Sequence, residues 1–379
     1  MLILGAGILG IILVAGLWPF HAPSNEVTWL ENEAGIRFSR YGSVVSSGAF
    51  HNAALRTNSE GSVEIWLEPS DPRSQRTILS FDGSDHPGAP FSLHQYKGGL
   101  VVHRYNVDEH GTARTAWITV DSVFREQGPV LVSIVLDKQS TSVYLGGVLA
   151  KVSPILGVST NNLTGRLVVA NSPRANDSWS GLIRGLAIYQ RQLTPGEVAQ
   201  HYASWTKKRR PPLGRDEDPL ALYLFNEDQG RVVHNEIDPA NSLILPERYF
   251  VLHPGLLVSP QRDYHSTWSY WEDVAVNIAG FIPLGGWVFA YCSSVRRVKS
   301  PAALTIFVGF SISFVIEVLQ AFLPTRTSGM TDIITNTLGT VIGVMFCQLP
   351  VIRGWLTTAQ RRSKHLVTTE SELETALSA

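Results

Sequence analysis

Cysteine and charged residues are both scarce in this chain of 379 residues. Two cysteines exclude a disulfide framework and a cysteine-rich metal scaffold. Charged residues make up 17% of the chain, against about 25% in soluble globular proteins. The 31 basic and 32 acidic side chains give a net charge of -1, whereas a dedicated nucleic-acid binder shows a basic excess. The composition therefore predicts no nucleic-acid partner. The next question is which regions of the chain contain few charged residues.

The charge deficit is confined to two regions. Residues 1–25 contain no Asp, Glu, Lys or Arg, and residues 266–350 contain only eight. A membrane-spanning helix needs about 20 mostly apolar residues, with about 17 as the lower bound. The first region has no cleavage signal of the A-x-A type after its apolar run, so we expect an anchor and not a signal peptide. The sequence predicts a four-helix transmembrane α bundle from segments 2–18, 270–292, 302–323 and 333–352.

Basic side chains gather at two ends of these segments. One cluster lies between the second and third segments, and the other follows the fourth. Cytoplasmic loops of membrane proteins carry the excess of Lys and Arg. The sequence therefore predicts a multi-pass membrane protein, with both termini cytoplasmic and the region between the first two helices extracytoplasmic. The two clusters are Arg296, Arg297 and Lys299, and Arg353, Arg361, Arg362 and Lys364.

The extracytoplasmic region has the pattern of an all-β protein. Between residues 36 and 190, short runs of alternating apolar and polar residues are separated by Gly, Pro, Asn and Asp, as in SVEIWLEP at 62–69. Such spacing is typical of a sandwich or barrel. A short helix follows, with Thr194 as N-cap and Glu197 at the capping-box position. The spacing predicts that this region is an all-β sandwich or barrel closed by the short helix.

Polar side chains inside the apolar segments are candidates for function, because ionisable residues in a membrane are costly. They occur in pairs three or four residues apart, which places each pair on one helix face. Under the predicted topology, all of them and one loop arginine lie near the outer membrane face. We expect this arginine, Arg326, to neutralise part of the charge of the carboxylates. We expect a single polar cluster with two candidate catalytic carboxylates, Glu317 and Asp332, and five candidate binding residues, Asp273, Asn277, Gln320, Arg326 and Asn336.

Three interpretations of this cluster remain open. It can be a satisfied polar network that fixes helix packing, or a site that engages a lipid headgroup or a drug. It can also be catalytic, with Glu317 or Asp332 as general base and Arg326 as a phosphate clamp. Gly339 and Gly343 form a G-x-x-x-G, which permits close approach of two helices.

Calcium is the one cofactor that the extracytoplasmic region suggests. Asp82 follows a predicted strand, and Asn171 and Asp177 lie in one loop, so their oxygens are candidate calcium ligands. Asp and Asn also fill turns for purely conformational reasons, and we favour that interpretation. Farther along, KKRRPPLGRDEDP at 207–219 reads as a solvated linker or as a patch facing anionic polymers. The sequence predicts a linker with an extra strand over 206–265.

The all-β region resembles the laminin-G-like, concanavalin-A-like jelly rolls. The stretches that carry the resemblance are SVEIWLEP, TILSFDG, TSVYLGG and WSGLIRGLAIYQRQLTPGEVAQHY. The resemblance implies an all-β jelly-roll sandwich over 27–205. It also implies a lectin-like domain that binds a glycan or a protein, sometimes through calcium.

The apolar segments resemble the VanZ-like family. DVAVNIAGFIPLGG and SFVIEVLQAFLPTRTSGMTDIITNTLGTVIG carry the resemblance, which implies helix one at 1–20, helices two to four at 266–352 and a cytoplasmic tail at 353–379. The jelly roll is then an insertion after helix one. The family's namesake is associated with resistance to glycopeptide antibiotics of the teicoplanin type. The resemblance therefore implies a protein of the bacterial inner (plasma) membrane with a role at the cell envelope. The family pattern of Glu, Gln, Arg, Asp, Asn and Gly maps to Glu317, Gln320, Arg326, Asp332, Asn336 and Gly339.

Two classes of function follow from these resemblances. The first is an envelope protein whose jelly roll binds glycan or protein, and the sequence favours this class. The alternative is an intramembrane enzyme or carrier acting on a lipid-linked glycan through Glu317, Arg326 and Asp332. The implied partners are membrane lipid and an envelope glycan, a lipid-linked glycan or a glycopeptide.

Overall fold

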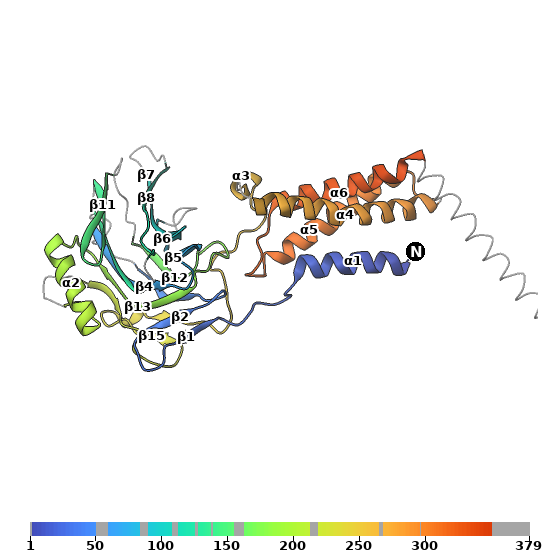
Figure 1. Ribbon diagram of the computed structural model, residues 1–379. Helices are drawn as coiled ribbons and strands as arrows, with labels where there is room; N and C mark the ends of the chain where they lie inside the picture. The colour runs from blue at the N-terminus through green and yellow to red at the C-terminus, as the bar shows by residue number, and fades with distance from the viewer. Residues whose placement is uncertain are drawn as a thin grey trace, which may run out of the picture. The chain divides into compact units, whose positions relative to one another are not determined.

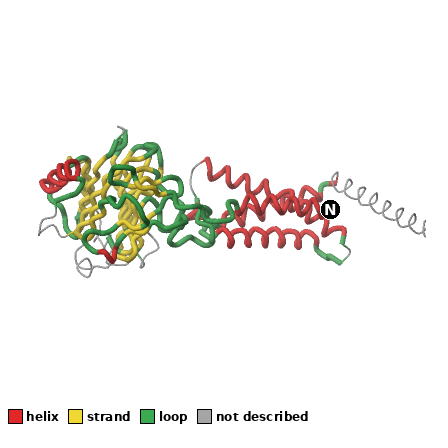
Figure 2. The backbone as a smooth tube through the Cα atoms, turned by 90° about the horizontal axis from the view of Figure 1, so that it is seen from below, coloured by secondary structure: helices red, strands yellow, loops and turns green. Residues whose placement is uncertain are grey.

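The computed structural model describes residues 2–50, 60–83, 90–107, 113–125, 128–137, 139–154, 163–212, 219–264, 268–295 and 297–350. The chain forms two compact units. The sandwich unit spans Ala22–Pro254, and the helical unit combines Met1–His21 with Gly255–Ala379. Figure 2 separates the strands of the first from the helices of the second by colour.

Two antiparallel sheets, each with eight described strands, form the sandwich unit (Figure 1). The first sheet runs in the order β1 (Val27–Trp29), β2 (Ile36–Phe38), β13 (Gly181–Tyr189), β4 (Gly61–Pro69), β9 (Val130–Leu136), β10 (Ser140–Leu145) and β11 (Val148–Pro154), with β14 (Pro219–Tyr223) also paired to β13. The second runs β15 (Val232–Val233), β16 (Leu243–Ile244), β3 (Val44–Phe50), β12 (Gly165–Val169), β5 (Gln75–Asp82), β6 (Phe91–Tyr96), β7 (Gly99–Val107) and β8 (Ala113–Val120). The predicted all-β sandwich is confirmed.

The main hydrophobic core of this unit joins apolar side chains from both sheets. Side chains of a strand alternate between its two faces. On β6, Phe91 and Leu93 belong to the core, while Ser92 and His94 lie outside that cluster. Trp179 is fully buried, and its Nε1 donates to Oε1 of Gln95 at 2.6 Å. The alternation in the sequence thus predicts which residues enter the core.

Helix α2 (Pro195–Lys208) packs on the first sheet, away from the main core. Val198 and Trp205 join a separate apolar cluster with Trp66 of β4. The predicted capping box is present, since Thr194 Oγ1 accepts from the N–H of Glu197 and Glu197 Oε2 accepts from the N–H of Thr194. The Arg191 guanidinium also donates to Glu197 and holds the pKa of that carboxyl at about 2.

The segment expected as a linker, 206–265, differs from that expectation. Residues 207 and 208 complete α2, and Arg209 is its left-handed C-cap. Beyond it, β14 pairs with β13, β16 pairs with β3, and a short 3-10 turn, η2 (Pro239–Asn241), lies between. Because each sheet offers an unpaired strand edge, this segment extends both sheets, and residues as far as Pro254 belong to the sandwich unit.

The described residues of the helical unit form one short helix and four longer ones. They are α1 (Leu2–Leu17), α3 (Pro260–Asp263), α4 (Trp268–Ser294), α5 (Pro301–Gln320) and α6 (Met330–Gln348). Three stretches are long and apolar enough to cross a membrane: Tyr270–Ser294, Pro301–Gln320 and Met330–Gln348. Helix α1 has 16 residues and is shorter than that requirement. The prediction of spanning helices is therefore supported for three of the four segments.

Glycines allow α4 and α6 to approach closely. A Cβ atom at Gly339 would collide with the carbonyl oxygen of Ile278, and one at Gly343 with that of Ile282. From the facing helix, a Cβ at Gly285 would meet the backbone of Thr340. The G-x-x-x-G of α6 thus lies in a backbone-to-backbone contact, as its spacing predicts.

Candidate functional sites

Polar side chains meet at one end of the helical unit, where α4 and α6 begin and α5 ends. Asn277 Nδ2 donates to Asp332 Oδ1 at 2.8 Å, joining α4 to α6. Asn336 Nδ2 donates to Ser313 Oγ at 2.9 Å, joining α6 to α5. The spacing of the pairs in the sequence thus corresponds to hydrogen bonds between helices.

The Glu317 carboxylate accepts a hydrogen bond from the backbone. Its side chain is almost fully buried, and Oε2 accepts from the N–H of Gly329 at 2.7 Å. Gly329 is the N-cap of α6, where backbone N–H groups have no partner within the helix. A carboxylate at this position also interacts favourably with the helix dipole. Glu317 therefore fixes the connection between α5 and α6.

Gln320 and Arg326 bond to the C-terminal end of α1. Gln320 Nε2 donates to the carbonyl oxygen of Gly16 at 2.8 Å. The Arg326 guanidinium donates to Trp18 O at 2.8 and 3.0 Å and to Ala15 O at 3.1 Å. The sequence suggested that Arg326 neutralises the nearby carboxylates, but the structure directs it to carbonyls. The last carbonyls of a helix lack partners and carry partial negative charge, which a guanidinium complements.

Asp273 is the residue of the predicted cluster that stays apart. It is exposed on α4, one turn before the half-buried Asn277. Two buried amide oxygens of the cluster, Gln320 Oε1 and Asn336 Oδ1, have no hydrogen-bond partner among the described residues. The cluster is thus mainly a set of helix-to-helix contacts. Two of its acceptor oxygens have no hydrogen-bond donor among the described residues.

The three calcium candidates of the sandwich unit are engaged in other contacts. Asn171 Oδ1 accepts the N–H groups of Ser172 and Asp177 at 2.9 and 3.0 Å, as in a turn. Asp177 pairs with Arg76 at 3.2 Å, and Asp82 Oδ2 accepts from His253 Nε2 at 2.7 Å.

A calcium site needs several oxygens facing one point. Among the described residues there is no group of three or more His, Cys, Asp or Glu side chains that could hold a metal ion. The oxygens of Asn171, Asp177 and Asp82 thus contact other groups of the chain, and calcium binding stays a prediction. Only the Asn171 contacts are those of a turn.

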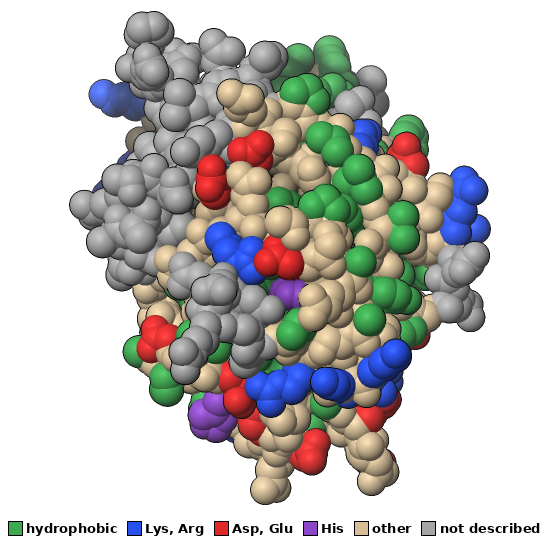
Figure 3. Space-filling model, turned by 90° about the vertical axis from the view of Figure 1, so that its left-hand side faces the viewer, with side chains coloured by type: hydrophobic (Ala, Val, Ile, Leu, Met, Phe, Trp, Pro, Cys, Tyr) green, Lys and Arg blue, Asp and Glu red, His purple; other side chains and the backbone are tan. Residues whose placement is uncertain are grey.

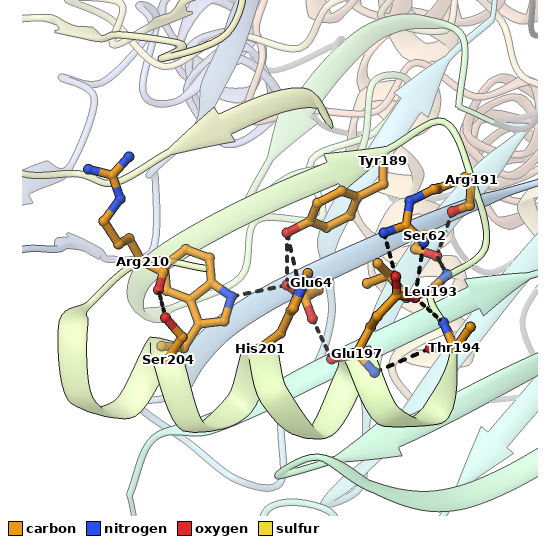
Figure 4. Close-up of polar contacts among 12 residues, drawn as sticks. Ser62, Glu64, Tyr189, Arg191, Leu193, Thr194, Glu197, His201, Ser204 and Arg210 are labelled. Atoms are coloured by element: carbon orange, nitrogen blue, oxygen red, sulfur yellow. Dashed lines mark hydrogen bonds and ion pairs between the residues drawn. The ribbon is translucent and has the colours of Figure 1, made fainter. Parts of the chain in front are cut away.

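A buried glutamate that the sequence did not single out anchors α2 (Figure 4). Glu64 of β4 accepts hydrogen bonds from Ser133 Oγ at 3.2 Å, Tyr189 OH at 3.1 Å, His201 Nδ1 at 3.0 Å and Trp205 Nε1 at 3.1 Å. All five side chains are buried. A ligand has no route to this carboxylate, so the network is a structural contact between the first sheet and α2.

A second group missed by the sequence analysis lies on the second sheet, where β5 to β8 are neighbours (Figure 1). The Trp117 side chain on β8 is 60% exposed, and its ring lies 4.3 Å from the His103 ring, centroid to centroid. Behind it, His103 Nδ1 is 3.4 Å from Ser92 Oγ, which is 2.8 Å from His94 Nε2. His94 Nδ1 is 3.0 Å from Thr77 Oγ1. This His–Trp group is a polar network that leads from the buried Ser92 and Thr77 to an exposed aromatic ring.

Exposed apolar side chains alone do not mark a site on this unit. On the face drawn in Figure 3, hydrophobic, basic and acidic side chains are interspersed. Scattered exposed hydrophobic residues are ordinary on protein surfaces. The interest of Trp117 therefore rests on the hydrogen-bonded side chains behind it.

Comparisons with solved structures give distant similarities. The chain is 14% identical to the botulinum neurotoxin serotype D binding domain over 48% of this chain and 45% of that chain, with a TM-score of 0.38. It is 15% identical to the binding domain of Paraclostridial Mosquitocidal Protein 1 over 49% and 47%, with a TM-score of 0.35. The chain thus matches less than half the length of these structures. No curated protein matches it.

Family models match both units. Residues 42–199 match the Concanavalin A-like lectin/glucanases superfamily, within the sandwich unit. Residues 221–352 match VanZ/LLP1, from β14 through α6. Both matches agree with the resemblances seen in the sequence. The chain therefore combines a concanavalin-A-like β-sandwich with a VanZ-like helical region.

Proposed function

We propose that this is a non-catalytic membrane protein of the bacterial envelope whose sandwich unit binds glycan. Its three spanning helices, with α1 as a further anchor, hold the sandwich outside the cytoplasmic membrane, and both termini lie inside. The bond from the Gly329 N–H to Glu317 carries this proposal, because it gives the main catalytic candidate a structural partner.

Catalysis by the helical cluster would require different contacts. A general base presents a carboxylate oxygen within reach of a substrate proton. Glu317 is 1% exposed and bonded to backbone, and Arg326 faces the carbonyls of α1. A buried hydrogen bond to a charged group contributes about 1.5–3 kcal/mol, as expected for Glu317, whereas the more exposed Arg326 contacts contribute less. The cluster therefore supports anchoring of the helices.

The envelope role rests on the VanZ-like region and the spanning helices. The resemblance to a family associated with teicoplanin resistance makes susceptibility to glycopeptides a suitable readout. In this proposal, the sandwich holds the protein at an envelope glycan, and loss of the protein changes the response to teicoplanin.

The test compares Glu317→Gln with Asp273→Asn in the full chain. Glutamine keeps an acceptor for the Gly329 N–H but cannot act as a base. We expect Glu317→Gln to lower the melting temperature of the purified protein while glycan binding and teicoplanin susceptibility stay as in the wild type. Asp273→Asn, at an exposed position of α4, should change neither property. A Glu317→Gln protein of normal stability that loses the envelope phenotype would establish catalysis by Glu317 instead.

The buried oxygens of Gln320 and Asn336 favour a second candidate function. Buried acceptors without partners are uncommon and costly. A lipid headgroup that donates hydrogen bonds, including that of a lipid-linked glycan, would satisfy them. In this candidate, the helical unit is a carrier or enzyme for such a lipid, with Glu317, Arg326 and Asp332 beside the headgroup.

Identification of lipids that copurify with the full chain tests this candidate. It requires one lipid class to be enriched over the surrounding membrane and lost in an Asn336→Leu variant. An unchanged lipid profile in Asn336→Leu would exclude it.

A further inference from the structure

We propose that Trp117, His103 and the side chains behind them form a saccharide-binding site on the second sheet. The apolar face of a sugar ring stacks on the Trp117 indole, and a sugar hydroxyl donates a hydrogen bond to Nε2 of His103. This inference rests on the proposed glycan binding by the sandwich unit and names where and how that binding occurs.

The direction of each hydrogen bond follows from the end of the network at Asp177. Asp177 is a carboxylate paired with Arg76, so it can only accept. Thr77 Oγ1 lies 2.5 Å from Asp177 Oδ2 and must donate its single proton there. Thr77 Oγ1 can then only accept from the neighbouring imidazole, which fixes the proton of His94 on Nδ1.

The same reasoning continues outward through Ser92. A neutral His94 with its proton on Nδ1 has a bare Nε2, so Ser92 Oγ donates to it. Ser92 has only one proton and must accept from His103, which fixes the proton of His103 on Nδ1. Nε2 of His103 is then an acceptor, and no described residue bonds to it.

Both imidazoles are neutral near pH 7, as this assignment requires. Burial, reinforced by nearby His94, lowers the pKa of His103 to about 4. Burial also lowers the pKa of His94, although the Asp177 carboxylate opposes that shift. An unprotonated His103 nitrogen therefore stands beside the exposed indole at physiological pH.

This pairing of groups selects a class of ligand. Aromatic side chains bind apolar ring faces, and a few fixed polar groups orient the ligand. The His103 ring lies against the Trp117 ring at 4.3 Å, with the planes inclined at 52°, so the indole is supported from one side. A saccharide offers both an apolar ring face and hydroxyl donors, whereas an anionic ligand brings acceptors that cannot bond to a bare nitrogen.

The binding experiment uses the full chain in detergent on an array of neutral and acidic oligosaccharides. We expect binding to neutral saccharides. Trp117→Ala should weaken it at least tenfold and Trp117→Phe only a few-fold. His103→Ala should also weaken it, while Tyr202→Ala, a matched exposed aromatic on α2, should leave it unchanged.

The outcomes separate the two proposals. A wild-type protein that binds the array, together with a Trp117→Ala protein that binds equally well, overturns this site and leaves glycan binding in place. A blank array for the wild type overturns both. Binding confined to acidic saccharides or to peptides contradicts the hydroxyl-to-nitrogen pairing.

The proton assignment has a readout of its own. In protein labelled with ¹⁵N-histidine, His103 Nε2 should give the resonance of an unprotonated nitrogen, identified by its loss in His103→Gln. Addition of the saccharide bound on the array should shift this resonance. Ser92→Ala should remove the fixed tautomer of His103 but not that of His94, which the Thr77 contact sets. A protonated His103 Nε2 in the wild type would refute the assignment.

Discussion

The two units bury a glutamate in different ways. In the sandwich, Glu64 accepts from four side chains, two of them on α2 and one each on β9 and β13. In the helical unit, Glu317 accepts from a backbone N–H at the start of α6. Helix ends expose unpaired backbone groups, whereas strands in a sheet have few to offer. A buried carboxylate therefore binds side chains in the sandwich and helix ends in the helical unit.

The His–Trp group of the sandwich differs from both. The Glu64 and Glu317 contacts are buried, so their partners are other parts of the chain. The network from Asp177 to His103 ends in an acceptor beside an exposed indole. Buried polar contacts in this protein stabilise the fold, and the partly open one is suited to bind a ligand.

The largest expected effect follows removal of Glu64. Glu64→Ala leaves four buried donors without their acceptor, and we expect it to lower the free energy of unfolding by about 3–5 kcal/mol. Glu68→Ala, on the same strand but 3.8 Å from Arg184 at the surface, should cost less than about 1 kcal/mol. Chemical denaturation of the full chain measures both. Equal losses for the two variants would refute the anchoring role of Glu64.

Acid should weaken the sandwich through His103. Its pKa is lowered to about 4 in the folded protein, against 6.5 for an ordinary histidine. The unfolded chain therefore binds a proton that the folded chain excludes, and stability falls as the pH drops from 6.5 toward 4. The loss is at most about 3 kcal/mol.

Denaturation at several pH values in wild type and His103→Gln measures this contribution. His94, Asp177 and Arg76 face this group and remain in the variant. The slope between pH 6.5 and 4 should be smaller in His103→Gln. An identical slope would show that His103 is already protonated in the folded protein.

The helical unit should be sensitive to one added methyl group. Gly339→Ala places a Cβ against the carbonyl of Ile278, and we expect a loss of about 1–3 kcal/mol as α4 and α6 separate. Gly280→Ala, on α4 with open space around it, should be neutral or stabilising by up to about 1 kcal/mol. Melting temperatures in detergent distinguish the two, and a stable Gly339→Ala protein would contradict the close contact.

The smallest effect is expected at Arg326. Arg326→Gln weakens the capping of α1, at a cost of about 1 kcal/mol. Arg297→Gln, an exposed control, should cost nothing measurable. Proteolysis near residue 20 should become faster only in Arg326→Gln. Loss of the envelope phenotype with unchanged proteolysis would point to a substrate contact by Arg326 instead.

Local sequence patterns predicted the elements and many of their contacts. Three of these patterns involve residues close together in the sequence. They are the strand alternation, the capping box at Thr194 and Glu197, and the G-x-x-x-G of α6. The four-residue spacing of Asp332 and Asn336 placed both on one face of α6. That face meets Asn277 of α4 and Ser313 of α5. These patterns are short-range, so a single sequence reveals them.

The contacts that escaped prediction join distant residues. Glu64 and His201 are 137 positions apart, and on an alternating strand Glu64 reads as a solvent-facing residue until α2 covers it. Ser92, His94 and His103 occupy the same polar face of their strands, and only the pairing of β6 with β7 brings them together. Arg326 was expected beside carboxylates because a sequence shows which side chains are charged. It does not show which backbone carbonyls at the end of α1 lack a hydrogen-bond partner.

The direct test of this account compares Trp117→Ala with Glu317→Gln in one set of experiments. Saccharide binding and melting temperature are measured for the full chain of each variant and of the wild type. The account predicts that Trp117→Ala loses at least tenfold in affinity at an unchanged melting temperature, while Glu317→Gln melts earlier and binds normally. Normal binding by Trp117→Ala, or loss of binding by a stable Glu317→Gln, would contradict it.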